Sequence, residues 1–187
     1  MTIHSAPPKL TYADLLELPE DRFRHELIDG VHYMSPAPVL KHQQIVVNLG
    51  RILSTFVREH GLGRIFVAPV DVVFSEHDVV EPDVLYVSNA KADRLTERYV
   101  AGAPDLAVEV LSPSSRGMDR IKKRRLYETR GVPEYWIVDP LLETLEVYRT
   151  SSDGSLAYQA TLSLAAGDTM ETPLLAGLEI SLREVFE

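Results

Sequence analysis

Two acidic residues in the middle of the chain stand where a carboxylate could do chemistry. Asp83 follows Pro82 at the start of the apolar run 84–87, and Glu109 lies inside the apolar run 106–111. A carboxylate buried in such a run is costly unless it is paired or bound to a metal ion. The structural alternatives are that Asp83 only forms a turn before its strand and that Glu109 only pairs with an Arg or Lys.

A basic segment at 118–130 offers a positively charged partner for these acids. If it is an α-helix, 100° per residue places Lys123 midway between Leu126 and Tyr127, on the apolar face that a packed helix buries. Lys122, Arg124 and Arg125 of the segment point elsewhere. The alternative is that Lys123 runs along the apolar surface to reach water or a structural acid.

Two acids at strand positions and one inward lysine form a set that suits phosphate chemistry. Carboxylate oxygens can hold Mg²⁺ or Mn²⁺, which keeps several waters and bridges to phosphate oxygens. The lysine would orient or deprotonate the attacking water, or stabilise charge on the phosphate in the transition state. The set therefore predicts metal-assisted hydrolysis of a phosphodiester bond.

The elements that must position this set follow from hydrophobic periodicity and turn signals. A short helix begins at Thr11, the Asp29-Gly30 pair predicts a hairpin, and the apolar stripe of 42–60 predicts a long helix. Further strands are expected at 64–68, 71–74, 84–87, 106–111, 134–138, 145–149 and 158–162, with a second helix at 118–130. This order favours a three-layer α/β domain around a mixed sheet, with β additions at both ends.

Composition fits a single soluble domain spanning residues 1–187. Apolar residues make up 45% of the chain and charged residues 25%, and there is no cysteine, which excludes disulfides, thiolate zinc sites and a cysteine nucleophile. We expect no signal peptide and no membrane span, and hence a cytoplasmic protein.

The formal net charge of −9 argues against a protein that coats DNA non-specifically. The charge is uneven, however. Residues 116–130 hold seven basic and two acidic side chains. A local basic edge beside the acids therefore remains compatible with a nucleic-acid substrate.

Several motifs, in their order and spacing, give the chain a resemblance to the Uma2-type (DUF820) endonucleases of the PD-(D/E)XK superfamily, over residues 11–150. They are His25-Glu26-Leu27-Ile28-Asp29-Gly30, Ser35-Pro36 with His42, Glu81-Pro82-Asp83-Val84, Pro104-Asp105-Leu106-Ala107-Val108-Glu109-Val110-Leu111-Ser112-Pro113-Ser114, Lys123 with Tyr127, and Gly131-Val132-Pro133-Glu134-Tyr135-Trp136-Ile137-Val138-Asp139-Pro140. The resemblance implies a restriction-endonuclease-like core at about 11–150, with a β-rich C-terminal extension at about 145–187.

The same resemblance assigns roles to individual residues. Asp83 would be the PD aspartate and Glu109 the second acid, with the backbone carbonyl of Val110 as a further metal ligand. Glu26 matches an upstream acid that could hold a second metal ion or a water. The superfamily's lysine two residues after the second acid is Leu111 here, so Lys123 on the following helix takes its place, with Lys122 a weaker candidate. The implied cofactor is Mg²⁺ (or Mn²⁺), and the implied partners are DNA and a second copy in a homodimer.

Four further residues are candidates for contact with the substrate. They are His42, Arg120, Lys122 and Arg124. His42 begins the amphipathic helix, where it could equally be a satisfied structural residue.

Two other functions compete with a DNA nuclease. A nuclease-like fold can serve as a catalytically silent nucleic-acid-binding or assembly module, in which case the acids and the lysine need not converge. A two-carboxylate sugar hydrolase is the weaker alternative, because it leaves Lys123 and the basic segment unexplained.

Overall fold

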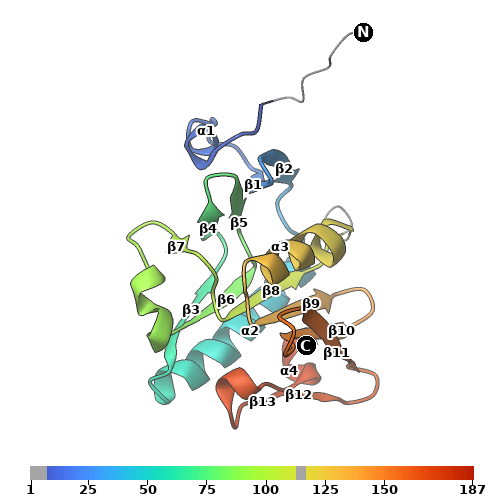
Figure 1. Cartoon of the computed structure of the whole chain (residues 1–187). Coiled ribbons are helices and arrows are strands. Elements are labelled where there is room, and N and C mark those ends of the chain that lie inside the picture. The colour runs from blue at the N-terminus through green and yellow to red at the C-terminus, as the bar shows by residue number, and fades with distance from the viewer. Residues whose placement is uncertain (1–7, 113–116) are drawn as a thin grey trace.

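A computed structural model describes residues 8–112 and 117–187. Pro113 and Ser114 of the resemblance motif, Arg116 of the basic segment and the N-terminal residues 1–7 lie outside the described residues. Figure 1 shows the chain from its N-terminal elements at the top of the view to its C-terminal elements at the bottom.

The central element is a mixed six-stranded sheet with the order β11-β10-β9-β8-β6-β3. Strands β8 and β9 are parallel, and the other neighbours are antiparallel. The strands are β3 (Gly63–Val67), β6 (Val84–Ser88), β8 (Leu106–Val110), β9 (Glu134–Asp139), β10 (Thr144–Thr150) and β11 (Leu156–Ser163).

A second sheet of five short strands has the order β2-β1-β5-β4-β7. Its strands are β1 (Arg24–Ile28), β2 (Val31–Ser35), β4 (Val72–Ser75), β5 (Asp78–Val80) and β7 (Val100–Ala101). Strands β12 (Thr169–Glu171) and β13 (Glu179–Ser181) form a separate pair. The helices are α1 (Tyr12–Leu16), α2 (Leu40–Glu59), η1 (Asn89–Arg94), η2 (Met118–Lys123), α3 (Arg124–Thr129), η3 (Pro173–Leu175) and α4 (Leu182–Phe186).

Side-chain alternation along the six-stranded sheet divides the core in two. Leu106, Val108 and Val110 of β8 face a cluster built with α2, α4 and the β12–β13 pair. Ala107 faces the opposite cluster, which α3 and the five-stranded sheet cover. The layers are therefore α2 with the C-terminal elements, the six-stranded sheet, and α3 with the second sheet. This confirms the predicted α/β class.

The first helix and the hairpin follow the sequence signals closely. Thr11 caps α1 and forms a capping box with Asp14, each accepting from the other's backbone N–H. Asp29 and Gly30 have φ of 53° and 71°, the left-handed pair that a tight hairpin turn requires. The turn therefore brings β1 and β2 together in the register that the Asp-Gly signal predicts.

The basic segment differs from the regular α-helix that we expected. Residues Met118–Lys123 form a π-helix, and only Arg124–Thr129 are α-helical. Ile121, an apolar residue of the π-helix, is 70% exposed, while Leu126 and Tyr127 are buried as predicted. Lys123 is buried with them, so its predicted orientation holds although the first turns are wider than those of an α-helix.

Sequence signals missed β5, β7, η1 and α4, because each of these elements is only two to six residues long and too short to display a period.

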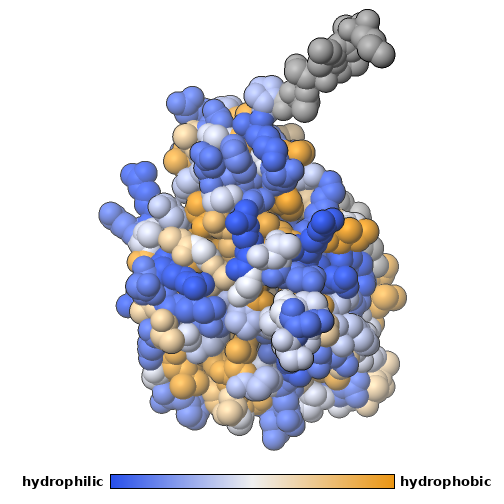
Figure 2. Space-filling model, in the orientation of Figure 1, coloured by the Kyte–Doolittle hydropathy of each residue, from blue (hydrophilic) through white to orange (hydrophobic). Residues whose placement is uncertain are grey.

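None of the helices within the two described ranges is long and apolar enough to cross a membrane. The face drawn in Figure 2 is mostly hydrophilic, with hydrophobic residues in small groups.

Candidate active site

A cavity of about 740 Å³ opens between the β1–β2 hairpin and the six-stranded sheet. Its lining includes side chains of β1, β8, η2 and the first turn of α2. Of the residues that the sequence analysis singled out, Glu26, His42, Asp83, Glu109, Val110 and Lys123 line this cavity. The structure thus brings the two acids, the lysine and the upstream acid to one place.

Asp83 is held in a fixed orientation directly before β6. Its Oδ1 accepts from Arg24 Nη2 at 2.8 Å, and its Oδ2 accepts from the backbone N–H of Val110 at 2.7 Å. His42 Nε2 lies 3.3 Å from the same Oδ2. Burial acts to raise the pKa of Asp83, but His42, Arg24 and the Val110 N–H outweigh it and hold the pKa below its usual value. Asp83 is therefore ionised at neutral pH.

Glu109 projects from the middle of β8 toward α3. Its Oε1 accepts from Tyr127 Oη at 2.6 Å and from Lys123 Nζ at 3.0 Å. Burial raises the pKa of Glu109 well above its usual value, and the Lys123 ammonium opposes this shift. Glu109 is thus paired with a Lys, as the structural alternative in the sequence analysis expected. The partner is Lys123, the same lysine that the sequence assigned to catalysis.

Lys123 Nζ is surrounded by three carboxylates. It lies 2.8 Å from Glu26 Oε1, 3.0 Å from Glu109 Oε1 and 3.6 Å from Asp119 Oδ1, and all four side chains are at most 2% exposed. Burial acts to lower the pKa of Lys123, but the three acids raise it above the usual value for lysine. The ammonium therefore neutralises part of a buried negative cluster.

Local structure explains why these side chains meet. Alternation along β1 places Arg24 and Glu26 on one face of the hairpin, two residues apart. Asp119 precedes Lys123 by four residues, which the wide turn of η2 brings to the same buried face. Arg24, Asp119 and Tyr127 were absent from the predicted site, and their spacing from Glu26 and Lys123 is the signal that could have indicated them.

Glu81 is a further acid at the cavity wall. Its backbone N–H donates to Glu26 Oε1 at 2.8 Å, and its side chain is 13% exposed, with Arg24 Nε 3.8 Å away. Burial raises the pKa of Glu81 to about 7, with Arg24 lowering it and Asp71 raising it further. The cavity therefore holds an acid that titrates near neutral pH in the metal-free protein.

Three of the predicted substrate contacts lie outside this cavity. Arg120 is paired with Glu146 and lies 3.7 Å from Asp139. Lys122 lies over the ring of Tyr33, and Arg124 lies over the ring of Tyr148. His42 does line the cavity, and its buried Nδ1 has no hydrogen-bond partner among the described residues.

The cavity offers oxygen donors of the kind that a divalent ion needs. Within the described parts of the chain, no three His, Asp or Glu side chains are grouped as a metal site. Oε2 of Glu26 and of Glu109 nevertheless accepts no hydrogen bond from a described residue, so each offers an oxygen. Such oxygens are the ligands that Mg²⁺ and Mn²⁺ prefer.

The backbone carbonyl of Val110 adds a donor of the same kind. The antiparallel register pairs Val84 with Val108, so its continuation sets Pro82 opposite Val110. Proline has no N–H to donate to that carbonyl. The residues present therefore fit a hard divalent cation.

Comparison with solved structures defines the class of fold. A crystal structure of a "putative nuclease belonging to DUF820" from Anabaena variabilis ATCC 29413 superposes with a TM-score of 0.76, covering 95% of this chain and 97% of that one at 24% sequence identity. The mixed sheet and its flanking helices therefore have the restriction-endonuclease-like fold predicted from the sequence.

Sequence comparison then gives the family. A family model named Uma2, described as "Putative restriction endonuclease", matches residues 12–183. The chain belongs to the Uma2 family, a family of nuclease type. The match extends beyond residues 11–150, over which the sequence motifs resemble this family, and includes β12, β13 and the first two residues of α4.

Two uncharacterized proteins of Synechocystis sp. (strain ATCC 27184 / PCC 6803 / Kazusa) are similar over most of their length. One is 30% identical over 164 residues, covering 84% of this chain and 85% of that protein. The other is 26% identical over 147 residues, covering 77% and 82%.

Proposed function

We propose that this protein is a metal-dependent endonuclease that hydrolyses phosphodiester bonds in DNA. The observation that carries the proposal is the convergence of Asp83, Glu109 and Lys123, all buried, at the wall of one open cavity. Asp83 directly precedes β6, Glu109 lies in the adjacent strand β8, and Lys123 ends η2. Buried ionisable groups that gather in a cleft with shifted pKa values are typical of active sites.

The cation would be Mg²⁺ (or Mn²⁺), held by Asp83, Glu109 and the Val110 carbonyl, with Glu26 as a further candidate ligand. When bound, such an ion polarises a phosphoryl oxygen and lowers the pKa of a coordinated water. Arg24 and the Val110 N–H fix the Asp83 carboxylate, so its orientation is set before any ligand arrives.

Lys123 would act through its positive charge. Its ammonium, surrounded by carboxylates, stays protonated in the metal-free protein, which favours donation of hydrogen bonds over removal of a proton. Once a divalent cation shares the carboxylates, an N–H of Lys123 can orient the attacking water or stabilise charge on the phosphate. Tyr127 positions Glu109 by its hydrogen bond to Oε1.

Cleavage of labelled DNA in Mg²⁺ and in Mn²⁺ tests the proposal. Asp83→Asn, Glu109→Gln and Lys123→Met are each expected to reduce the rate by at least about 100-fold. Glu97→Gln, at an exposed loop position, is the matched control and keeps the wild-type rate. A folded wild-type protein that cuts no nucleic acid with any divalent ion contradicts the proposal.

A catalytically silent binding module is the second candidate. The observation that favours it is the Lys123 ammonium, which already balances the acids that a cation would occupy. This function predicts that nucleic acid binds without being cut, and that Asp83→Asn leaves the binding unchanged.

A further inference from the structure

The mouth of the cavity carries exposed apolar side chains. Phe23 is 47% exposed, Val39 67% and Leu141 80%, and all three line the cavity whose floor holds the acids. They come from the segment before β1, the segment before α2 and the turn after β9. Exposed apolar groups gathered at the entrance of a charged site indicate contact with a ligand that has an apolar surface.

The cations of the cavity leave little charge for a phosphate backbone. Arg24 pairs with Asp83, and Lys123 pairs with Glu26 and Glu109. Three basic side chains of the Arg or Lys type line the cavity. Of these, Arg22 alone has no carboxylate partner among the described residues. A protein that grips a duplex through its backbone commonly makes about 6–10 phosphate contacts, which this entrance does not supply.

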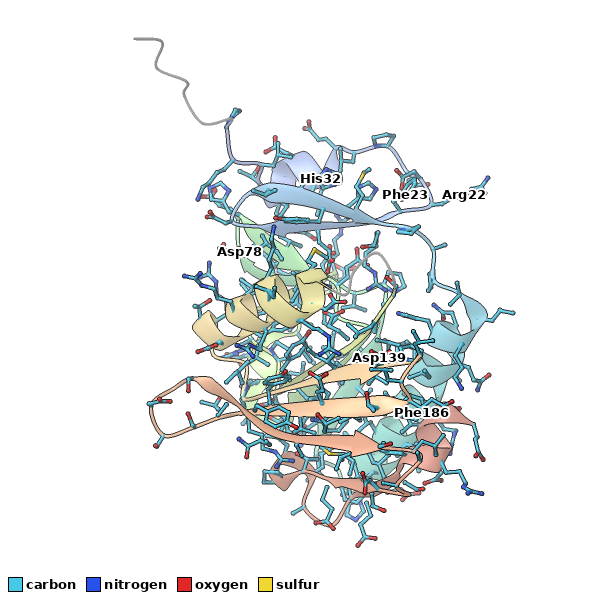
Figure 3. The ribbon with its side chains drawn as sticks, turned by 90° about the vertical axis from the view of Figure 1, so that its right-hand side faces the viewer. Arg22, Phe23, His32, Asp78, Asp139 and Phe186 are labelled. Carbon is cyan, nitrogen blue, oxygen red and sulfur yellow. The ribbon has the colours of Figure 1, made fainter. Side chains whose placement is uncertain are left out.

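The segment that carries Arg22 and Phe23 is anchored to the hairpin. Asp21 Oδ1 accepts from the Phe23 N–H at 2.7 Å and lies 2.9 Å from His25 Nε2, while His25 Nδ1 lies 2.9 Å from His32 Nε2. Figure 3 shows Arg22 and Phe23 together at the outer end of the hairpin layer, with Asp139 below them. The backbone at Phe23 is therefore anchored, and its half-exposed ring follows directly on Arg22, which has no carboxylate partner among the described residues.

We propose that the substrate is unpaired at the site of cleavage, as a single strand or an unpaired stretch within a duplex, with a base stacked on Phe23 and a neighbouring phosphate on Arg22. The inference rests on the proposed nuclease function and names its substrate class. Bases inside a duplex are stacked on one another and cannot reach Phe23, whereas an unpaired base exposes its ring face. Stacking of such a base on an aromatic ring supplies affinity that the few free cations cannot.

Binding is measured with a short single-stranded oligodeoxynucleotide that contains 2-aminopurine, and with a duplex of the same sequence. The buffer contains Ca²⁺, and a gel verifies that the DNA stays intact. The wild-type protein is expected to bind the single strand more tightly and to quench 2-aminopurine. Phe23→Ala is expected to lose about 5- to 150-fold in affinity for the single strand, and Phe23→Trp to retain it. Arg22→Ala is expected to reduce the slope of log affinity against log salt by about 0.7.

Leu16→Ala is the matched control, because Leu16 is 62% exposed on α1 and is not part of the cavity lining. Equal binding of duplex and single strand, or a Phe23→Ala protein that binds the single strand like the wild type, overturns the inference, and retained cleavage would then leave the nuclease function standing. If neither form is bound or cut, both proposals fail. A change of sedimentation coefficient in Phe23→Ala would assign the rim to a contact between copies and also overturn the inference.

Discussion

At the scale of single residues, the site depends on a buried ammonium that balances buried carboxylates. Lys123 is 2% exposed and touches Glu26, Glu109 and Asp119. Moving such a charge out of water costs several kcal/mol, which only close opposite charges can offset. The same residue thus serves folding and, in our proposal, chemistry, so activity assays alone cannot separate the two roles.

Replacing Lys123 by Met should destabilise the metal-free protein by about 3–5 kcal/mol at pH 7, because three buried acids lose their cation. The loss should shrink as the pH falls, since protonated carboxyls need no positive partner. Urea unfolding across pH 5–8 measures both effects. Lys122→Met, at the exposed neighbouring position over Tyr33, should change stability by less than about 1 kcal/mol. Equal losses in the two variants would contradict this account.

The raised pKa of Glu81 predicts how the stability of the folded protein depends on pH. The sign is opposite to that for an acid whose pKa is lowered by folding. The folded pKa of Glu81 is about 7 against the usual 4.5, so between these values the folded protein holds a proton that the unfolded chain has released. Stability therefore falls as the pH rises through this window, by up to about 3 kcal/mol. Glu81→Gln should remove most of that slope in urea titrations without metal, and Glu97→Gln should not. An unchanged slope in Glu81→Gln would show that another group titrates there.

At the scale of elements, the β1–β2 hairpin is the part that closes the site. It carries Arg24 to Asp83 and Glu26 to Lys123, contacts that span 59 and 97 positions of sequence. Asp78 of β5 accepts from the Asp29 N–H at 2.8 Å and pairs with Arg130, so the turn is tied to the helix behind it. Distortion of the turn should therefore be felt in the cavity.

Gly30→Ala tests this link. Gly30 has φ of 71°, and an added Cβ would lie 2.4 Å from Lys9 Cβ, whereas Gly154 has φ of 84° with open space around it. Both substitutions incur the left-handed backbone cost of about 1–2 kcal/mol. Gly30→Ala should therefore lower the free energy of unfolding more than Gly154→Ala, and only Gly30→Ala should reduce cleavage. If Gly154→Ala lowers the free energy of unfolding more than Gly30→Ala, the close contact of Gly30 with Lys9 does not constrain the turn.

At the scale of the whole molecule, the cavity exists because two sheets meet over one polar strand face. Acidic groups outnumber basic ones in its lining, which contains Asp21, Arg22, Arg24, Glu26, Glu81, Asp83, Glu109, Asp119 and Lys123. Together with the net charge of −9 on the whole chain, this excess of acids disfavours a phosphate in the metal-free cavity, and a bound divalent cation would offset it. The predicted homodimer stays a prediction, which sedimentation can check.

Divalent cations should therefore stabilise the folded protein. At 100 times its dissociation constant, Mn²⁺ or Mg²⁺ should raise the free energy of unfolding by about 2.7 kcal/mol, because the unfolded chain has no assembled site. Thermal unfolding with and without the ion measures the shift, and Glu109→Gln should lose most of it. A shift of the same size in Glu109→Gln would place the bound ion away from the cavity.

Local sequence patterns determined a good part of this protein. Alternation placed Glu109 among buried residues of β8, the Asp-Gly pair placed the hairpin turn, and helical periodicity directed Lys123 inward. These features depend on neighbours a few residues apart, so a short stretch of sequence contains the information. Only the tertiary structure decided that Glu26 and Asp119 share the Lys123 ammonium, that Arg24 fixes Asp83, and that Arg120, Lys122 and Arg124 lie outside the cavity. Those contacts join distant segments, and their geometry depends on how the two sheets and the π-helix pack.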